Sequence, residues 1–145
     1  MENIAIVCPS YNDYDCVASL AQELRTLSLK TSCASFDLIV VNDSPWIQIP
    51  NNLYDLAKEK EICSIHVLQL KVNLGHQAAL AIGLAWLMPR LHQYNYVVTM
   101  DADGEDNPWD IVSMIRQLET CHDRQLACVA KRGLRLSLIH ISEPT

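Results

Sequence analysis

The chain has 145 residues, of which 50% are hydrophobic and 19% are charged, and its formal net charge is −6. This size and balance are typical of one globular domain with a buried core, and they exclude a disordered chain. The net negative charge and the scattered basic residues argue against a nucleic-acid-binding surface, so we expect no nucleic acid partner.

Membrane and compartment signals indicate a cytoplasmic protein. The longest apolar stretch, 78–88, is shorter than a membrane-spanning helix, which needs about 20 residues. The N-terminus has neither the basic start nor the cleavage site of a secretory signal. The cysteines include no Cys-x-x-Cys pair, and several stand in apolar segments. We therefore expect buried, reduced cysteines and no membrane span in this chain.

Apolar, β-branched runs alternate with segments of helical periodicity along the chain. The runs predict strands at 4–8, 38–41, 65–70, 96–100 and 126–130. The periodic segments predict helices at 17–27, 53–60, 75–91 and 108–119. This alternation predicts an α/β fold, with a mainly parallel sheet and helices on both of its faces.

Side chains near the helix ends and on the helix faces refine this expectation. Asn12 or Asp13 is expected to cap the first helix, and Asn107 to cap the last. The many small residues of the 75–91 helix predict close packing on the sheet. The expected inner face of the last helix consists of Trp109, Val112, Ile115 and Leu118.

Polar side chains gather where four of the predicted strands end. In a parallel sheet these ends share one edge, and ligands bind beyond that edge. The polar groups are at 11–13, 42–44, 73 and 101–106. Their coincidence with the strand ends predicts a binding site.

Asp101 and Asp103 are the strongest chemical signal. Residues i and i+2 at a strand end point the same way, so both carboxylates could face one ligand. Paired carboxylates are best accommodated by a divalent cation, and hard oxygen ligands suit Mg²⁺ or Mn²⁺. Gly104 would let the backbone turn tightly there. The alternative is a solvated acidic turn that also caps the next helix.

The segment from Asp101 to Gly104 also resembles a second motif, the Asp-x-Asp-Gly-Thr of haloacid-dehalogenase phosphatases. Here Glu105 replaces the threonine, and the motif lies far from the first strand. A phosphatase therefore remains a minor alternative. An EF-hand loop is excluded, because Gly104 stands at the fourth place rather than the sixth.

Other positions near the strand ends each allow two interpretations. Asp43 could accept hydrogen bonds from a base or a ribose, or it could close an Asx-turn. Tyr11 could pack against a base, or it could be ordinary surface. Asn73 could cap the helix that follows it, and the N-terminus of that helix would present N–H groups to an anion. His76 could be a solvated residue of the first helical turn.

Four segments, at 6–13, 39–44, 73–84 and 100–108, together resemble a known family. Their order and rough spacing are similar to those of family-2 glycosyltransferases of the GT-A fold. The resemblance is nearest to the dolichyl-phosphate-mannose-synthase-like and bacterial polyprenyl-phosphate enzymes. It implies a Rossmann-like nucleotide-sugar-binding domain.

The resemblance also implies roles for individual residues. The residues implied to bind the donor nucleotide are Pro9, Tyr11, Asp13, Asp43, Asn73 and Asp101. Asp101 and Asp103 would form the family's Asp-x-Asp motif, with Asp103 as the direct ligand of Mn²⁺ or Mg²⁺. A sugar would pass from a UDP- or GDP-sugar to an acceptor such as polyprenyl phosphate, with inversion at the anomeric carbon. No catalytic base is assigned.

The chain departs from the family pattern at three places. Asp13 stands where many members have Glu, and Val72 stands where relatives usually carry Arg, with Lys71 nearby. Relatives also continue beyond 132 with an acceptor-binding region and frequently with membrane segments, which would hold the full-length protein at the inner face of the membrane.

The last residues, 136–145, resemble translated sequencing adapter. We therefore expect 1–135 to be a C-terminally truncated donor-binding domain and 136–145 to be a non-native tail. A nucleotide-binding fragment without transfer activity is the alternative to a complete transferase.

Overall fold

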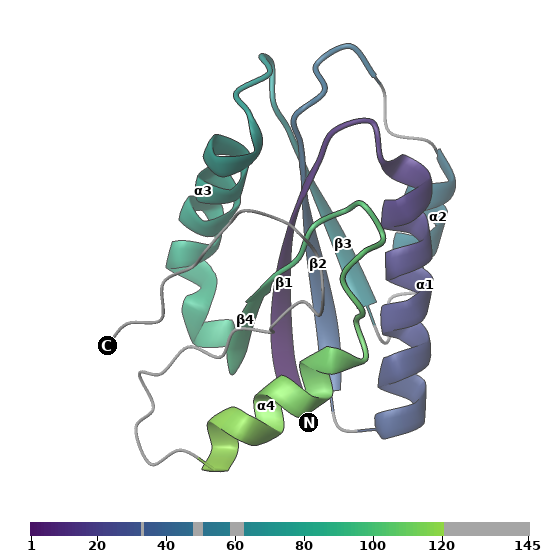
Figure 1. Ribbon diagram of the computed structural model, residues 1–145, viewed down its shortest axis with the longest axis vertical. Helices are drawn as coiled ribbons and strands as arrows, with labels where there is room; N and C mark the ends of the chain where they lie inside the picture. The colour runs from purple at the N-terminus through teal and green to yellow at the C-terminus, as the bar shows by residue number, and fades with distance from the viewer. Residues whose placement is uncertain (33, 48–50, 59–62, 121–145) are drawn as a thin grey trace. The chain divides into compact units, whose positions relative to one another are not determined.

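The computed structural model describes residues 1–32, 34–47, 51–58 and 63–120 (Figure 1). The chain divides into two compact units, Met1–Ile111 and Val112–Thr145. The first unit contains every strand of the described residues. The predicted strand at 126–130 and the tail at 136–145 lie outside the described residues.

The first unit is built on a parallel sheet with the strand order β3-β2-β1-β4. The strands are β1 (Glu2–Ser10), β2 (Ala34–Asn42), β3 (Cys63–Gln69) and β4 (Tyr96–Thr99). All neighbouring strands pair in parallel, which confirms the predicted α/β sheet. β1 and β2 are longer than predicted because their pairing runs from Glu2 and Ala34 to Ser10 and Asn42.

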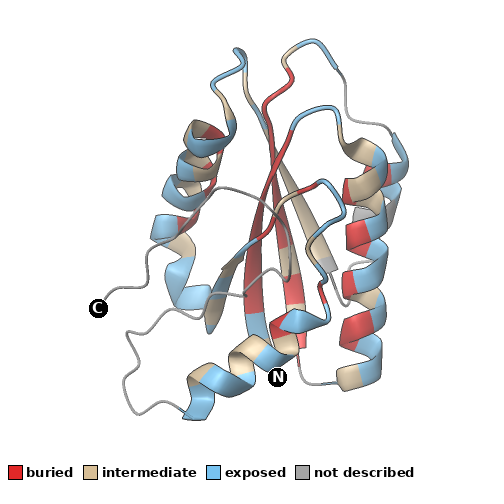
Figure 2. Ribbon diagram, in the orientation of Figure 1, coloured by how far each residue is buried: buried red, intermediate tan, exposed pale blue. Residues whose placement is uncertain are grey.

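Helices lie on both faces of this sheet, as predicted (Figure 1). α1 (Tyr14–Thr31) and α2 (Asn51–Lys58) lie on one side, and α3 (His76–Leu87) lies on the other. β1 and β2 are therefore covered on both faces, and Figure 2 shows buried residues along both strands. The buried residues of α1 include all five of the periodic apolar positions, which are Val17, Leu20, Ala21, Leu24 and Leu27.

The predicted helix at 75–91 was too long. α3 ends at Leu87, and the chain continues as a 3₁₀-helix, η1 (Met88–Gln93). Pro89 explains the change, because proline has no N–H to donate and its ring crowds the preceding turn of an α-helix. Proline is tolerated in the first turn of the new helix, where its N–H would have no partner in any case.

The capping predictions were correct in position but not in mechanism for α1. Asp13 is the N-cap residue of α1, yet its side chain makes no capping hydrogen bond. Asn107 Oδ1 accepts the N–H of Trp109 at 3.1 Å, and α4 (Asp110–Thr120) begins after that turn. The expected inner face of α4 was wrong at its start, since Trp109 is 39% exposed and Ile111 is buried.

α3 approaches the sheet closely at Gly83. A Cβ atom added there would lie 2.5 Å from Val7 Cγ1 and 2.8 Å from Val41 Cγ2. Ala79, one turn earlier, is fully buried in the same apolar cluster. The predicted close packing of this helix therefore holds at positions 79 and 83, whereas Ala85 faces solvent.

A polar network joins three elements near the start of β2. Tyr94, which follows η1, donates its hydroxyl to Asp37 Oδ2 at 2.7 Å. Ser64 of β3 donates its hydroxyl to Asp37 Oδ1 at 2.6 Å. Burial raises the pKa of Tyr94 above its ordinary value, and the bond to Asp37 raises it further because only the neutral phenol can donate. This network lies at the opposite end of β2 from its C-terminus.

Gly83→Val should destabilise the first unit by at least about 2 kcal/mol, because the new side chain would overlap Val7 and Val41. Ala85→Val adds the same side chain two positions later on the exposed side, and it should change stability by less than about 0.5 kcal/mol. Chemical denaturation measures both changes. Equal effects of the two substitutions would contradict the close approach at Gly83.

Tyr94→Phe should flatten the decline of stability at alkaline pH. The folded chain keeps Tyr94 protonated, whereas the unfolded chain ionises it near pH ~10. The contribution of Tyr94 is therefore complete below pH ~10 and is lost as pH rises above that value. Urea denaturation between neutral and alkaline pH measures the slope. An unchanged slope in Tyr94→Phe would refute this account.

Candidate functional site

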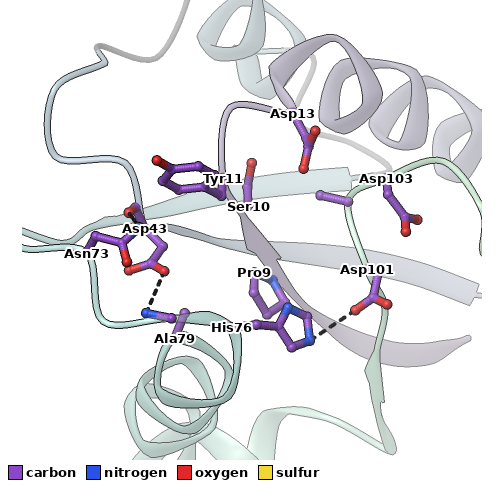
Figure 3. Close-up of a pocket in the computed structure, with 12 residues that line it drawn as sticks. Pro9, Ser10, Tyr11, Asp13, Asp43, Asn73, His76, Ala79, Asp101 and Asp103 are labelled. Atoms are coloured by element: carbon purple, nitrogen blue, oxygen red, sulfur yellow. Dashed lines mark hydrogen bonds and ion pairs between the residues drawn. The ribbon is translucent and has the colours of Figure 1, made fainter. Parts of the chain in front are cut away.

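A cavity of about 390 Å³ lies at the edge of the sheet where the parallel strands end (Figure 3). Its lining comes from the ends of β1 and β2, the segment that leads into α3, and the loop after β4. The lining residues are Pro9, Ser10, Tyr11, Asp13, Asp43, Asn73, Gly75, His76, Ala79, Asp101, Ala102 and Asp103. Every site residue predicted from the sequence is among them, so the structure brings the whole predicted set together. Their binding roles remain predictions.

Asp43, at the end of β2, is engaged by the backbone of the segment before α3. Its Oδ1 accepts the N–H of Leu74 at 2.7 Å, and its Oδ2 accepts the N–H of Gly75 at 2.9 Å. Asp43 is 4% exposed. The alternative of a local Asx-turn was therefore wrong, because the carboxylate joins two segments distant in sequence. Each carboxylate oxygen has a second lone pair, so Asp43 can still accept a bond from a ligand.

Asn73 does not cap α3, so that alternative was also wrong. Gly75 is the N-cap residue, with φ of 91° and no side-chain cap. The Asn73 side chain instead donates to the backbone oxygen of Asp43 at 3.2 Å. The segment 73–75 is thereby held against the end of β2, with Gly75 and His76 at the cavity wall.

His76 is partly exposed, as expected for a first-turn residue, but it also has a partner across the cavity. Its Nε2 lies 3.2 Å from Asp101 Oδ1, and Figure 3 shows this contact. The pair links the start of α3 to the loop after β4. No pattern in the sequence indicated it, because the two residues are far apart in the chain and meet only through the sheet order.

The loop after β4 carries the Asp-x-Asp pair. β4 ends at Thr99, so the alternation of a strand does not set the directions of Asp101 and Asp103, as we had expected. Asp103 is exposed and its Oδ1 accepts the N–H of Glu105 at 2.9 Å, beside Gly104 with φ of 80°. Asp103 thus takes part in a local turn, as the acidic-turn alternative expects, but no hydrogen bond of Asp103 to the first turn of α4 is observed among the described residues, and both carboxylates line the cavity.

The donor set suits a divalent cation that arrives with a ligand. No three His, Cys, Asp or Glu side chains of the described residues come together as a metal site. Asp101 and Asp103 supply two carboxylates from one loop. Mg²⁺ is commonly held in this way, by one or two carboxylates together with water and substrate phosphates. The residues present thus fit a cation shared with a diphosphate.

Cys8 is buried close to several carboxylates at this edge of the sheet. Burial raises the pKa of its thiol, and four nearby carboxylates raise it further. These carboxylates are Asp101, Asp106, Asp103 and Asp13. A thiol in this environment stays protonated and is a poor nucleophile. Cys8 is therefore structural, in agreement with its free, buried state.

One further residue of the cavity wall was missed by the sequence-based prediction. Ser10, between the predicted residues Pro9 and Tyr11, is 2% exposed. Among the described residues, its Oγ is the buried side-chain polar atom that has no hydrogen-bond partner. No pattern in the sequence marks such an atom, because its isolation results from the packing around it.

Asp43→Asn should destabilise the chain by about 1–3 kcal/mol, because an amide NH₂ would replace one of two oxygens that accept backbone N–H groups. Denaturation at neutral pH measures the loss. Glu23→Gln makes the same chemical change on an exposed face of α1 and should leave stability nearly unchanged. A neutral outcome for Asp43→Asn would mean that these two bonds contribute little.

Comparisons with known proteins identify a family for this chain. Residues 5–135 match the family described as "Glycosyl transferase family 2". The "Uncharacterized glycosyltransferase YkcC" of Bacillus subtilis is 25% identical over 88% of this chain and 37% of its own length. The "Undecaprenyl-phosphate 4-deoxy-4-formamido-L-arabinose transferase" of Serratia proteamaculans is 26% identical over 85% of this chain and 36% of its own. The "Dodecaprenyl-phosphate galacturonate synthase" of Rhizobium johnstonii is 26% identical over 80% and 32%.

The chain therefore spans about a third of the length of these three relatives. Among solved structures, S. aureus TarS aligns with a TM-score of 0.42 and 18% identity, over 81% of this chain and 20% of that one. Within the described ranges, no helix is long and apolar enough to cross a membrane. The dolichyl-phosphate-mannose-synthase-like subtype stays a prediction, and the haloacid-dehalogenase alternative gains no support. Because the family match covers most of its length, the chain belongs to glycosyl transferase family 2, with an α/β sheet of the GT-A type.

Proposed function

We propose that the cavity binds the nucleoside diphosphate part of a UDP- or GDP-sugar, and that the whole protein transfers the sugar to a polyprenyl phosphate. The proposal rests on one observation. Residues from four separate segments, each predicted to bind the donor, line a single cavity in a chain of this family. The acceptor is suggested by two relatives, whose names include undecaprenyl and dodecaprenyl phosphate.

The cavity wall offers different chemistry along its length. The Tyr11 ring is 52% exposed and provides a flat apolar surface on which a base can pack. Asp43 and Asn73 supply polar groups at the end of β2. The first turn of α3 begins at His76, and the N–H groups of a first turn attract anions such as phosphate.

The other end of the cavity is acidic and cannot hold a diphosphate without help. Asp13, Asp101 and Asp103 all line it, and their charges repel phosphate oxygens. We propose that Asp101 and Asp103 hold Mn²⁺ or Mg²⁺, with His76 keeping the Asp101 carboxylate at the cavity edge. A cation bound there would act as a Lewis acid that offsets the charge on the departing nucleoside diphosphate.

Transfer would then be one displacement at the anomeric carbon. A phosphate oxygen of the acceptor forms the new bond to that carbon as the bond to the nucleoside diphosphate breaks, with inversion. Such an oxygen is already anionic and needs no proton removed, so a general base is dispensable. We place this reaction on the cytoplasmic side of the membrane, where the free thiols of Cys8 and Cys16 would remain reduced.

Binding of UDP or GDP should require a divalent cation. Isothermal titration should give binding with Mn²⁺ or Mg²⁺ and none after chelation, because the carboxylates then face the diphosphate directly. Asp103→Asn should weaken binding at least about tenfold, since it removes one charge–cation contact while it keeps the oxygen that accepts the Glu105 N–H.

Asp110→Asn is the matched control. Asp110 is exposed in the first turn of α4 and does not line the cavity, so its substitution should leave affinity unchanged. Unchanged nucleotide affinity after chelation would count decisively against a cation-dependent donor site.

A further inference from the structure

The loop that carries Asp101 and Asp103 is closed by a third carboxylate. Asp106 Oδ2 accepts the backbone N–H of Asp101 at 3.0 Å, so this side chain bridges the two ends of the loop. The residue before the loop, Met100, donates its N–H to the Val7 oxygen of β1 at 3.1 Å. Asp101 therefore follows directly on a residue that is fixed to the sheet, and its own N–H is held by the end of the loop.

Asp106 reaches Asp101 from outside the cavity of about 390 Å³, here called the donor cavity. Asp101 and Asp103 line the donor cavity, as Figure 3 shows, whereas Asp106 does not. Asp106 instead lines a second cavity of about 300 Å³, which lies between α1 and the loop. Asp101 lines both cavities, so the loop forms a wall between them. Asp106 thus supports the Asp101 backbone from the side of α1.

A carboxylate at this position adds negative charge to an acidic loop. Burial raises the pKa of the nearby Cys8 thiol, and Asp101, Asp106 and Asp103 all raise it further, which shows how closely these charges gather. A neutral side chain can close a turn, as Asn107 does when its Oδ1 accepts the Trp109 N–H at 3.1 Å. A hydrogen bond to a carboxylate is stronger than one to a neutral amide, so Asp106 restrains the Asp101 backbone more firmly.

We propose that Asp106 is a positioning residue, which holds the Asp101 N–H and thereby keeps the carboxylates of Asp101 and Asp103 at the donor cavity. This inference rests on the proposed function, in which those two carboxylates hold a divalent cation. Without the bond, the loop would sample more backbone conformations. Ordering the loop when the cation and the nucleotide bind would then cost affinity.

Two substitutions separate the hydrogen bond from the charge. Asp106→Ala removes both, whereas Asp106→Asn removes the charge and keeps an oxygen that can accept the Asp101 N–H. Amide hydrogen exchange at Asp101, followed by NMR in the free chain, should be about fivefold faster in Asp106→Ala. In Asp106→Asn it should stay within about twofold of wild type. This measurement needs neither the cation nor a nucleotide.

Titration with UDP or GDP in Mn²⁺ tests the consequence for binding. Asp106→Ala should bind about fivefold more weakly, and Asp106→Asn should stay within about twofold of wild type. Asp15→Ala is the matched control, because Asp15 lines the same second cavity from α1 and none of the hydrogen bonds between described residues joins it to the loop. This substitution should change neither the exchange at Asp101 nor the affinity. A purely structural role of Asp106 would lower the melting temperature of Asp106→Ala and leave its affinity unchanged.

The outcomes separate this inference from the function on which it rests. If wild type binds neither UDP nor GDP with the cation, the proposed function fails and the inference fails with it. If wild type binds and Asp106→Ala binds equally well, only the inference fails. Equal weakening by Asp106→Ala and Asp106→Asn would also overturn it, because the charge rather than the bond would then matter. Unchanged exchange at Asp101 in Asp106→Ala would show that the bond does not restrain the loop, and the inference would again fail.

Discussion

The burial of β1 on both faces is the constraint from which the remaining arrangement follows. Ile4 to Cys8 form a continuous apolar run with almost no exposed surface. Such a strand is stable only between two other strands and between two layers of helix. Parallel neighbours then bring the carboxyl ends of β1, β2 and β4 to one edge, and that edge holds the cavity. The site is therefore a direct result of how the core is packed.

The carboxylates at this edge of the sheet differ in how far other groups of the chain offset their negative charge. Asp43 has both carboxylate oxygens bonded to backbone N–H groups. Asp101 contacts His76, whereas Asp103 is exposed beside its own turn. Burial raises the pKa of the Cys8 thiol, and four nearby carboxylates raise it further. The acidic end thus has an excess of negative charge that the described side chains only partly offset.

Much of this architecture could be predicted from the sequence, and the failures have physical causes. Continuous apolar runs rich in β-branched residues, such as Ile4 to Cys8, predict buried strands. Turn residues mark the ends of these strands. The predicted helix at 75–91 overran Pro89 because its apolar periodicity continues past the proline. The His76–Asp101 contact and the bonds of Asp43 join distant segments, and their geometry depends on loops that no local pattern describes. The isolation of Ser10 Oγ likewise depends on its packed surroundings.

Asp43 has one more consequence, which concerns how such a site can change during evolution. The same carboxylate lines the cavity and anchors the segment before α3, so a substitution that alters recognition at this position also loosens the fold. Tyr11 has an exposed ring, and none of the described hydrogen bonds uses its side chain to join two segments of the chain. If the cavity binds a nucleotide as we propose, new nucleotide preferences should therefore arise at positions like Tyr11, while Asp43 stays constant.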